Sequence, residues 1–382
     1  MVMLLTALIF NRMKELVIII LAAFLASSCR DKESPMSEWP WDDPEVVDPD
    51  AGKATLDKWS EVSADFGTLP SYIRIYSSPE KLEEKNAVAY IAVADLNQAR
   101  WDVWSVKSDD SYATEDSYKT PSEIYRDAEW PVVINGGFFY HSGGTNYTSS
   151  LAVSGSEILA YNINYASEDW KTIYYPTRAA FAELPDGSFD ACWTYFRTDG
   201  HYMYPAPAAN SWTGKPAKQP SATDPEGGKE FSAKTAIGGG PVLINNGKFT
   251  DSFEAELFNG TSGIGPDSDQ PRTAIGVTSD LKMIFFVCEG REMTEGVKGL
   301  TTADVANVLL DLGCVEAINL DGGGSTTFVL RNAENDLTVQ NVPSGPPLPI
   351  SYAKYDLPTP KPNGASQARA VADCLLVVAT DR

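Results

Sequence analysis

The feature of this sequence with the clearest chemical potential is a carboxylate followed by three glycines. The segment contains, in order, Asp321, Gly322, Gly323, Gly324, Ser325 and Thr326. Glycine has no Cβ and adopts positive φ, so a ligand can approach the main chain closely. Successive N–H groups in such a turn can form an anion-binding nest, to which neighbouring hydroxyls add donors. A carboxylate and an anion cradle repel each other unless a reaction uses both, so we interpret this segment as a candidate catalytic site.

A tight β-turn in which Asp321 only caps its own loop is the alternative interpretation, because Asp often does this. The segment does not match a P-loop, since the Gly-Lys-Ser/Thr sequence is missing and a strand pattern rather than a helix pattern follows. The choice between a catalytic turn and a structural turn therefore depends on the rest of the chain.

Other polar residues lie at the ends of predicted strands. Asn135 and Gly136 follow the apolar run 130–134, and Arg272 stands at the entry of a predicted hairpin, 271–291. Glu289 and Arg291 are two apart, so a strand continuing through them would place both on one face. By the same alternation Asn319 and Asp321 share a face.

The elements that must position these residues are mostly strands. A predicted helix begins with Thr301 or Thr302 as N-cap, has Asp304 in a capping-box position, and ends at Gly313. Its apolar face is formed by Val305, Val308, Leu309 and Leu312. A closing strand, 367–378, carries Arg369. These patterns predict one large α+β domain of mixed, largely antiparallel sheets with a few packed helices.

Six motifs occur in a fixed order along the chain. They are N-G-G-F-F at 135–139, G-G-G-P-V-L-I-N-N-G-K at 238–248, R-T-A-I-G-V at 272–277, V-C-E-G-R at 287–291, N-L-D-G-G-G-S-T-T at 319–327 and R-A-V-A-D at 369–373. The ordered set resembles the phosphodiester glycosidase family from about Tyr90 to the C-terminus. Residues 192–230 do not fit that pattern and are interpreted as an insertion specific to this chain.

The resemblance implies hydrolysis of a sugar-1-phosphodiester at the anomeric carbon, which releases a free, N-acetylglucosamine-like sugar and a phosphomonoester. A phosphate leaving group is a weak base, so its departure needs charge stabilisation more than a proton. Arg272, Arg291 and the glycine nest are suited to hold it. Asp321 is the first choice for the base or nucleophile and Glu289 the second.

Asn135 and Asn319 are predicted to orient sugar hydroxyls or the attacking water, and Arg369 is a further candidate for substrate binding. Each assignment has a structural alternative. Glu289 and Arg291 could form a surface ion pair, Arg272 could brace the loop after Pro271, and Arg369 could simply extend its charge to solvent.

Composition excludes several other chemistries. The only histidines are His141 and His201, and neither has a metal-like or triad-like partner pattern. We therefore expect no cofactor; calcium held by oxygens of Asp321 and Asn319 is the remaining alternative. The net charge of −22 argues against nucleic acid as a partner. Cys192, Cys288, Cys314 and Cys374 are as compatible with buried thiols as with disulfides.

The N-terminus predicts export. Basic residues precede an apolar run, 16–24, that is too short to span a bilayer, and small residues then lead to Cys29. This pattern resembles a bacterial lipobox, so residues 1–29 are interpreted as a lipoprotein signal with Cys29 as the lipidated residue; a plain signal peptide is the alternative. Residues 30–55 are predicted to be an acidic flexible tether, and 56–382 the domain.

The combined prediction is a hydrolase tethered by lipid to the membrane of the bacterial cell envelope, facing the periplasm or the surface, and acting on a glycan or sugar phosphate. Two other functions stay open. One is a non-catalytic carbohydrate-binding lipoprotein, and the other is a phosphodiesterase that cleaves the other P–O bond. The aromatic residues of 192–230 could either stack on sugars or anchor a long loop.

Overall fold

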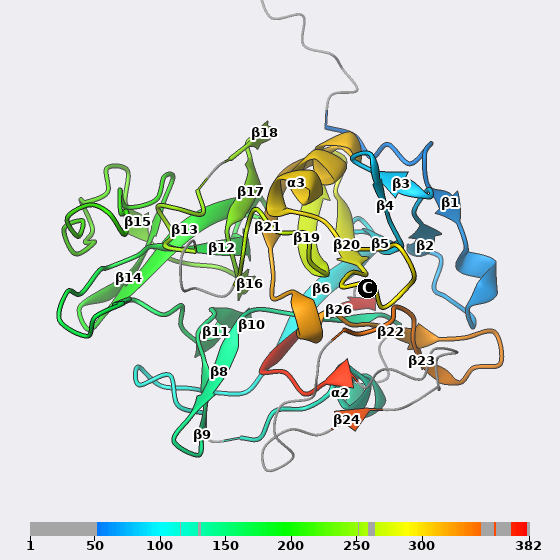
Figure 1. Cartoon of the computed structure of the whole chain (residues 1–382), viewed down its shortest axis with the longest axis horizontal. Coiled ribbons are helices and arrows are strands. Elements are labelled where there is room, and N and C mark those ends of the chain that lie inside the picture. The colour runs from blue at the N-terminus through cyan, green and yellow to red at the C-terminus, as the bar shows by residue number, and fades with distance from the viewer. Residues whose placement is uncertain are drawn as a thin grey trace, which may run out of the picture. The chain divides into compact units, whose positions relative to one another are not determined.

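The computed structural model describes residues 52–114, 116–128, 131–250, 252–258, 264–344, 355–356 and 368–379. The predicted signal segment with Cys29 and most of the predicted tether lie outside these residues. Residues 50–382 form one compact unit, and Figure 1 shows its elements.

Three large sheets make up the described part of the chain. The first has the strand order β1 (Ser60–Glu61), β2 (Ile73–Ser77), β5 (Ala89–Asp95), β20 (Lys282–Cys288), β19 (Arg272–Thr278), β21 (Cys314–Asn319), β17 (Val242–Asn245) and β18 (Lys248–Phe249). The second has the order β11 (Glu157–Ala160), β10 (Ala152–Ser154), β16 (Thr235–Gly238), β12 (Arg178–Glu183), β13 (Phe189–Arg197), β14 (Gly200–Tyr204) and β15 (Lys229–Glu230). The third has the order β23 (Leu337–Val339), β22 (Phe328–Arg331), β7 (Val133–Asn135), β26 (Asp373–Ala379) and β6 (Ala99–Ser105).

Smaller elements complete the described residues. Three two-stranded pairs are formed by β3 (Lys81–Leu82) with β4 (Lys85–Asn86), β8 (Phe139–Ser142) with β9 (Thr145–Thr148), and β24 (Tyr355–Asp356) with β25 (Ala368–Arg369). The helical elements are α2 (Pro121–Ala128), α3 (Thr302–Asp311) and the 3₁₀ turns η1 (Ser63–Asp65) and η3 (Gly323–Ser325). The large sheets contain antiparallel pairs, as predicted. Strands predominate over helices, so the α+β prediction fits only loosely.

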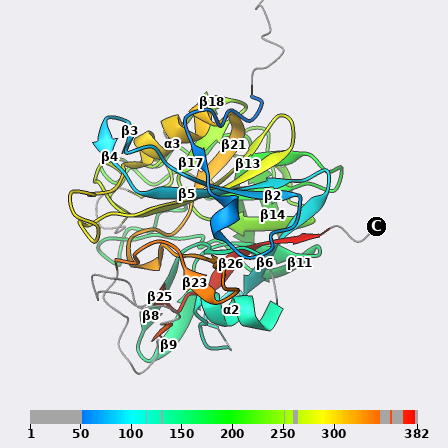
Figure 2. The same cartoon turned by 90° about the vertical axis from the view of Figure 1, so that its right-hand side faces the viewer.

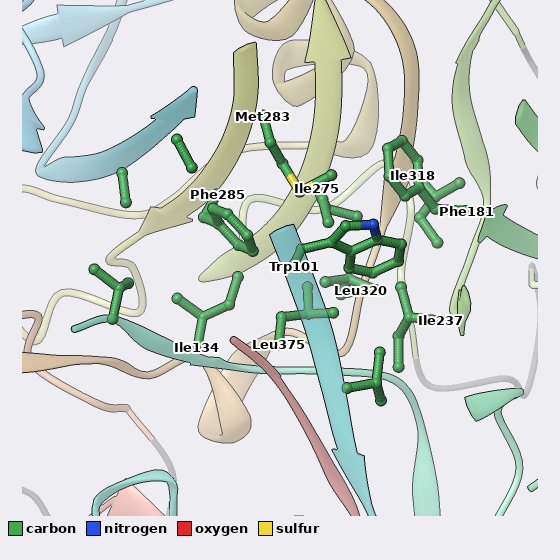
Figure 3. Close-up of a cluster of buried hydrophobic side chains, with 14 of the residues drawn as sticks. Trp101, Ile134, Phe181, Ile237, Ile275, Met283, Phe285, Ile318, Leu320 and Leu375 are labelled. Atoms are coloured by element: carbon green, nitrogen blue, oxygen red, sulfur yellow. The ribbon is translucent and has the colours of Figure 1, made fainter. Parts of the chain in front are cut away.

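The strands β19 and β20 show why the sequence folds as it does. Both are buried on both faces, and their residues alternate between two apolar clusters. Ile275 and Phe285 enter a central core, whereas Ala274 and Phe286 face a second cluster under α3. In Figure 3, side chains from all three large sheets meet in the central core; the labelled ones include Trp101, Phe181, Ile318 and Leu375. Period-two alternation therefore specifies this hairpin, as predicted.

Helix α3 also follows its prediction. Thr301 is the N-cap: its side chain accepts from the Asp304 N–H, and the Asp304 carboxylate accepts from the Thr301 N–H. Gly313 adopts φ +88° after the last turn, the left-handed conformation typical of a helix end. Val305 and Leu309 are buried against the first sheet, and Figures 1 and 2 both show α3 close to β17 and β21.

Three segments differ in detail from their predictions. Residues 52–55, assigned to the tether, pack on the domain: the Ala54 N–H donates to Asp280 and the Thr55 N–H to the Leu312 carbonyl. Residues 192–230 contribute β14 and β15 and most of β13 to the second sheet, so this segment is more ordered than a long loop. The predicted closing strand is also divided, because Ala370–Ala372 separate β25 from β26.

Candidate functional site

The register of the first sheet brings the predicted site residues to one edge. Arg272 begins β19 and pairs with Cys288, the last residue of β20, while Asn319 ends β21 opposite Ala274. Because neighbouring strands are antiparallel, the segments that follow β20 and β21 leave the sheet beside the start of β19. The second sheet adds Arg178, the first residue of β12.

These segments line a cavity of about 570 Å³. Its polar wall contains a carboxylate, two amides, four arginines and three consecutive glycines; these are Asp321, Asn319, Gln270, Arg178, Arg272, Arg291, Arg369, Gly322, Gly323 and Gly324. Aromatic residues form much of the remaining wall, namely Phe138, Phe139, Tyr140, Tyr165, Trp170, Trp212 and Phe258. In a chain of net charge −22, this concentration of arginine marks a site for an anionic ligand.

Asp321 is the carboxylate of the cavity. Its carboxylate accepts hydrogen bonds from the Ser325 hydroxyl and the Gly322 N–H, and the charges of Arg369 and Arg291 favour its ionised form. Burial acts more strongly in the opposite direction and raises the pKa of Asp321 to about 6. A carboxylate with this pKa is ionised at neutral pH and remains a usable base.

Arg291 and Arg369 lie next to this carboxylate in the cavity wall. Arg369 donates to the Ser325 hydroxyl at 3.4 Å, and Arg291 donates through Nε to Gln270 at 2.8 Å. Burial lowers the pKa of Arg291, and the nearby Arg369 charge lowers it further. Because burial and Arg369 both disfavour the charged form of Arg291, a ligand with negative oxygens beside Arg291 would favour it.

Arg272 lines the same cavity, but its donors are largely used by the protein. Its guanidinium donates to the carbonyls of Leu300, Ile264, Gly265 and Ser268 at 2.7–3.2 Å. Burial lowers its pKa to about 10. Arg272 therefore braces the loop before Pro271 and the chain at Leu300, rather than the loop after Pro271, and it shapes the cavity wall.

Most N–H groups of the predicted nest already have partners within the protein. The Gly322 N–H donates to the Asp321 carboxylate, and the Gly323 N–H donates to the Pro271 carbonyl. The Ser325 and Thr326 N–H groups are used within η3 and its cap. The Ser325 and Thr326 hydroxyls are fully buried and bond inside the protein. The charged donors at this end of the cavity are therefore the guanidinium groups of Arg291 and Arg369.

The turn nevertheless needs its glycines. Gly323 adopts φ +58°, and a Cβ there would lie 2.8 Å from a guanidinium nitrogen of Arg291. A Cβ on Gly322 would lie 2.6 Å from the Pro271 carbonyl oxygen. The glycines thus let Arg291 and the chain before Arg272 approach the backbone beside Asp321.

Glu289 is not part of the cavity wall, which corrects its prediction. Strand β20 ends at Cys288 and Arg291 adopts φ +57°, so Glu289 and Arg291 do not share a strand face. One carboxylate oxygen of Glu289 accepts from the Thr294 hydroxyl and the other from the Val342 N–H. Glu289 therefore ties two loops together behind the site.

Asn135 and Gly136 also lie behind the cavity rather than in it. The Asn135 amide donates to the Asp321 carbonyl at 2.7 Å and accepts from the Thr273 hydroxyl and the Thr327 N–H. The Gly136 carbonyl accepts from the Asp321 N–H at 3.0 Å. The predicted contact of Asn135 with a sugar or water is thus replaced by a positioning role, in which it fixes the backbone of Asp321.

Asn319 agrees better with its prediction. Its Nδ2 donates to the carbonyls of Gly240 and Leu320. Asn319 lines the cavity, and its buried Oδ1 has no hydrogen-bond partner among the described residues. Because an unsatisfied buried acceptor costs roughly 1–3 kcal/mol, this oxygen is suited to accept from a hydroxyl or amide of a ligand.

Sequence reasoning missed two charged residues. Asp373 is fully buried beside Gly136, and its Oδ1 accepts from the Gly137 N–H. Burial, together with the Asp321 charge, raises the pKa of Asp373 to about 8, so it is mainly protonated at neutral pH. The second missed residue is Arg178. In the sequence it is marked only as a single basic residue just before the apolar run 179–182. The signal for Asp373 was a carboxylate inside an apolar closing segment.

The aromatic residues of 192–230 divide between their two predicted roles. Trp193, Tyr195 and Tyr204 are buried, which supports anchoring. Trp212 contributes to the cavity wall, where stacking on a sugar is feasible. All four cysteines of the described part are buried free thiols. No cluster of three or more His, Cys, Asp or Glu side chains suited to a metal occurs within the described ranges.

The cavity is cationic, lies at the edge of antiparallel sheets and has Asp321 as the carboxylate of its wall. The family described as phosphodiester glycosidase matches residues 129–378. The chain therefore belongs to the phosphodiester glycosidase family.

Individual relatives are more distant. Human N-acetylglucosamine-1-phosphodiester alpha-N-acetylglucosaminidase is 36% identical over 95 residues, which are 25% of this chain and 18% of that protein. An uncharacterized prophage-derived protein of Bacillus subtilis, YomE, is 33% identical over 92 residues, 22% of this chain and 13% of its own. The catalytic domain of the zebrafish N-acetylglucosaminidase aligns over 85% of this chain and 89% of its own, with 18% identity and a TM-score of 0.49.

Proposed function

We propose that this protein hydrolyses a sugar-1-phosphodiester at the anomeric carbon and releases free sugar and a phosphomonoester. The observation that carries the proposal is the half-buried Asp321 carboxylate in a cavity shared with Arg291 and Arg369. Family membership supports the reaction class. The N-acetylglucosamine-like sugar of the human relative's name is the substrate we test first.

The roles follow from charge. The two arginines hold the phosphodiester and stabilise the negative charge that increases on it as the C1–O bond breaks. Asp321, ionised above pH about 6, removes a proton from the attacking water or attacks C1 itself. The bridging oxygen stays with the phosphate, and the oxygen added to C1 comes from water.

A second carboxylic acid is not required for this reaction. Most glycosidases use two carboxyl groups, one of which protonates the leaving oxygen. A phosphomonoester has a second pKa of about 6, so it leaves without that proton. This agrees with a cavity wall in which Asp321 is the carboxylate, while Glu289 and Asp373 are enclosed behind it.

Location in the bacterial envelope through a lipid on Cys29 is part of the same proposal, and the lipobox-like pattern before Cys29 supports it. Neither helix in the described part of the chain has the length and apolar character needed to cross a bilayer. Metabolic labelling with a fatty acid, lost in Cys29→Ala, would test the anchor.

The test of the reaction is hydrolysis of an N-acetylglucosamine-1-phospho-methyl diester in water enriched in oxygen-18. We expect free sugar carrying the label at C1 from the wild type and none from Asp321→Asn. Label in the phosphate instead would identify a phosphodiesterase that cleaves the other P–O bond. Binding without turnover across a panel of sugar-1-phosphodiesters would identify a carbohydrate-binding protein.

A further inference from the structure

The cavity has a further cationic group, Arg178, that the proposed reaction does not use. Only 9% of this residue is exposed, and its guanidinium lies over the ring of Phe258 at 4.0 Å. Its Nε has no hydrogen-bond partner among the described residues. Burial lowers its pKa to about 10, so it still carries its charge at neutral pH.

The protein supplies little to compensate this buried charge. Glu256 is the carboxylate that favours the charged form of Arg178, and no ion pair joins them within the described part. The Glu256 carboxylate is instead engaged by the Ala179 and Val242 N–H groups, the Ser252 hydroxyl and the Trp193 indole. Burial raises the pKa of Glu256, which weakens it further as a counter-charge. A buried cation without a partner is costly unless a ligand provides one.

Arg178 lies apart from the cations assigned to the phosphodiester. Asp321 and Arg369 act on the charge of Arg291, whereas Glu256 acts on that of Arg178. The wall between the two ends is continuous. At one end, the Gly239 N–H donates to the carbonyl of Ala179, which follows Arg178 in the chain. At the other end, the carbonyl of Gly240 accepts from the Asn319 amide.

The order along the wall places the sugar between the two cationic ends. Asn319 is two residues before Asp321, and both line the cavity together with Gly239. The buried Oδ1 of Asn319 has no hydrogen-bond partner among the described residues. With C1 of the sugar at Asp321 and the phosphate at Arg291 and Arg369, Asn319 meets a sugar hydroxyl. Arg178 then meets a group on the far side of the sugar ring.

We propose that Arg178 forms a second anion subsite, which recognises a carboxylate or phosphate carried by the sugar itself in addition to the phosphodiester at C1. The orientation rests on the proposed function. The Phe258 ring covers one face of the guanidinium, which leaves its N–H edge for two parallel hydrogen bonds to an oxyanion. A neutral sugar would leave this buried charge uncompensated.

Direct binding tests the subsite without relying on turnover. Calorimetry on the full-length protein would compare glucose 1-phosphate, glucuronic acid 1-phosphate and glucose 1,6-bisphosphate, which share the C1 phosphate and differ at C6. We expect one of the two ligands with an anionic group at C6 to bind at least about tenfold more tightly than glucose 1-phosphate, as for a charge-assisted pair. The tighter of the two identifies carboxylate or phosphate as the group recognised.

Three variants make the comparison specific. Arg178→Gln should bring the three affinities within about twofold of one another. Arg178→Lys keeps the charge and the Phe258 contact but lacks the fork, so it should retain part of the preference and guards against a misfolded Gln variant. Arg74→Gln, at an exposed position of β2, is the matched control and should behave as wild type. Equal wild-type affinities, or a preference that survives in Arg178→Gln, would overturn the subsite.

The two proposals fail separately. Hydrolysis of diesters with no preference for an anionic sugar would overturn the Arg178 subsite and leave the reaction standing. An Arg178-dependent preference in a protein that hydrolyses no diester would overturn the reaction and keep the subsite.

Discussion

The turn after β21 and the turn after β20 leave the same edge of one sheet, and each carries a carboxylate close to an arginine. After β21, Asp321 opens onto the cavity, where its carboxylate is held by a hydroxyl and an N–H and acted on by two guanidinium groups. After β20, both oxygens of Glu289 are occupied by Thr294 and Val342, and the side chain is 3% exposed. The two carboxylates therefore differ although their positions in the fold are similar: Asp321 is available for chemistry, whereas Glu289 links two loops.

The arginines show the same division. Arg272 donates to four backbone carbonyls, whereas the Arg291 guanidinium donates to one side chain, that of Gln270, within the described residues. The difference between a binding group and a bracing group is thus the number of donors that the protein itself already uses. The predictions below test this difference, first for the carboxylates and then for the arginines.

The largest expected effect separates the two carboxylates. Asp321→Asn should lower kcat by about 10³-fold or more, because general-base or nucleophilic function is lost while the shape is kept. Glu289→Gln should keep kcat/KM within about tenfold and lower the free energy of unfolding by about 1–2 kcal/mol, because two buried hydrogen bonds lose their charged acceptor. Steady-state kinetics and urea unfolding measure both.

A normally folded Glu289→Gln variant with the activity loss of Asp321→Asn would contradict this division. Glu289 would then act on substrate in a conformation in which the Thr294 and Val342 contacts are broken.

Sequence patterns predicted the elements of this site better than the availability of its side chains. The β19–β20 hairpin and helix α3 follow from local signals, namely period-two alternation and a capping box. The Glu289 contact with Val342 spans 53 residues, and the Arg272 contacts depend on the fold of residues 264–268 and 300. No pattern within a strand or turn reveals which donors and acceptors such distant segments will occupy.

Contacts between distant segments also explain why sequence reasoning missed two residues. Arg178 and Asp373 come from β12 and β26, in two different sheets, and only tertiary packing brings them to the cavity or behind it. Each broke the apolar pattern of its own segment, so sequence could mark it as unusual. Asn135 gave the opposite error: a polar residue at a strand end suggested ligand binding, but its amide is saturated by Asp321, Thr273 and Thr327.

The second prediction contrasts Arg291 with Arg272. Arg291→Met should lower kcat/KM for a sugar-1-phosphodiester by about 10- to 100-fold, mainly through charge-assisted bonds to the phosphate, and change stability little. Arg272→Met should lower the free energy of unfolding by about 3 kcal/mol, because several buried carbonyls lose their donor. Arg291→Met without a kinetic effect, or Arg272→Met with the stability of wild type, would show that counting occupied donors does not identify the binding arginines.

The smallest effect concerns Asp373, a third carboxylate with one oxygen held by Gly137 and no access to the cavity. Its pKa is raised from 3.8 to about 8 in the folded protein, so between these values the folded state binds a proton that the unfolded state has released. The stability of the wild type should therefore fall as pH rises from 4 to 8, with the full penalty present above pH 8. Asp373→Asn has no such proton, so its advantage over wild type should grow with pH and reach at least about 1 kcal/mol at pH 8. Urea unfolding at pH 5, 6.5 and 8 measures the difference in free energy of unfolding between the variant and the wild type. A constant difference across this range would mean that Asp373 is already ionised in the folded protein. Enclosure alone would then not keep a carboxylate out of the chemistry at Asp321.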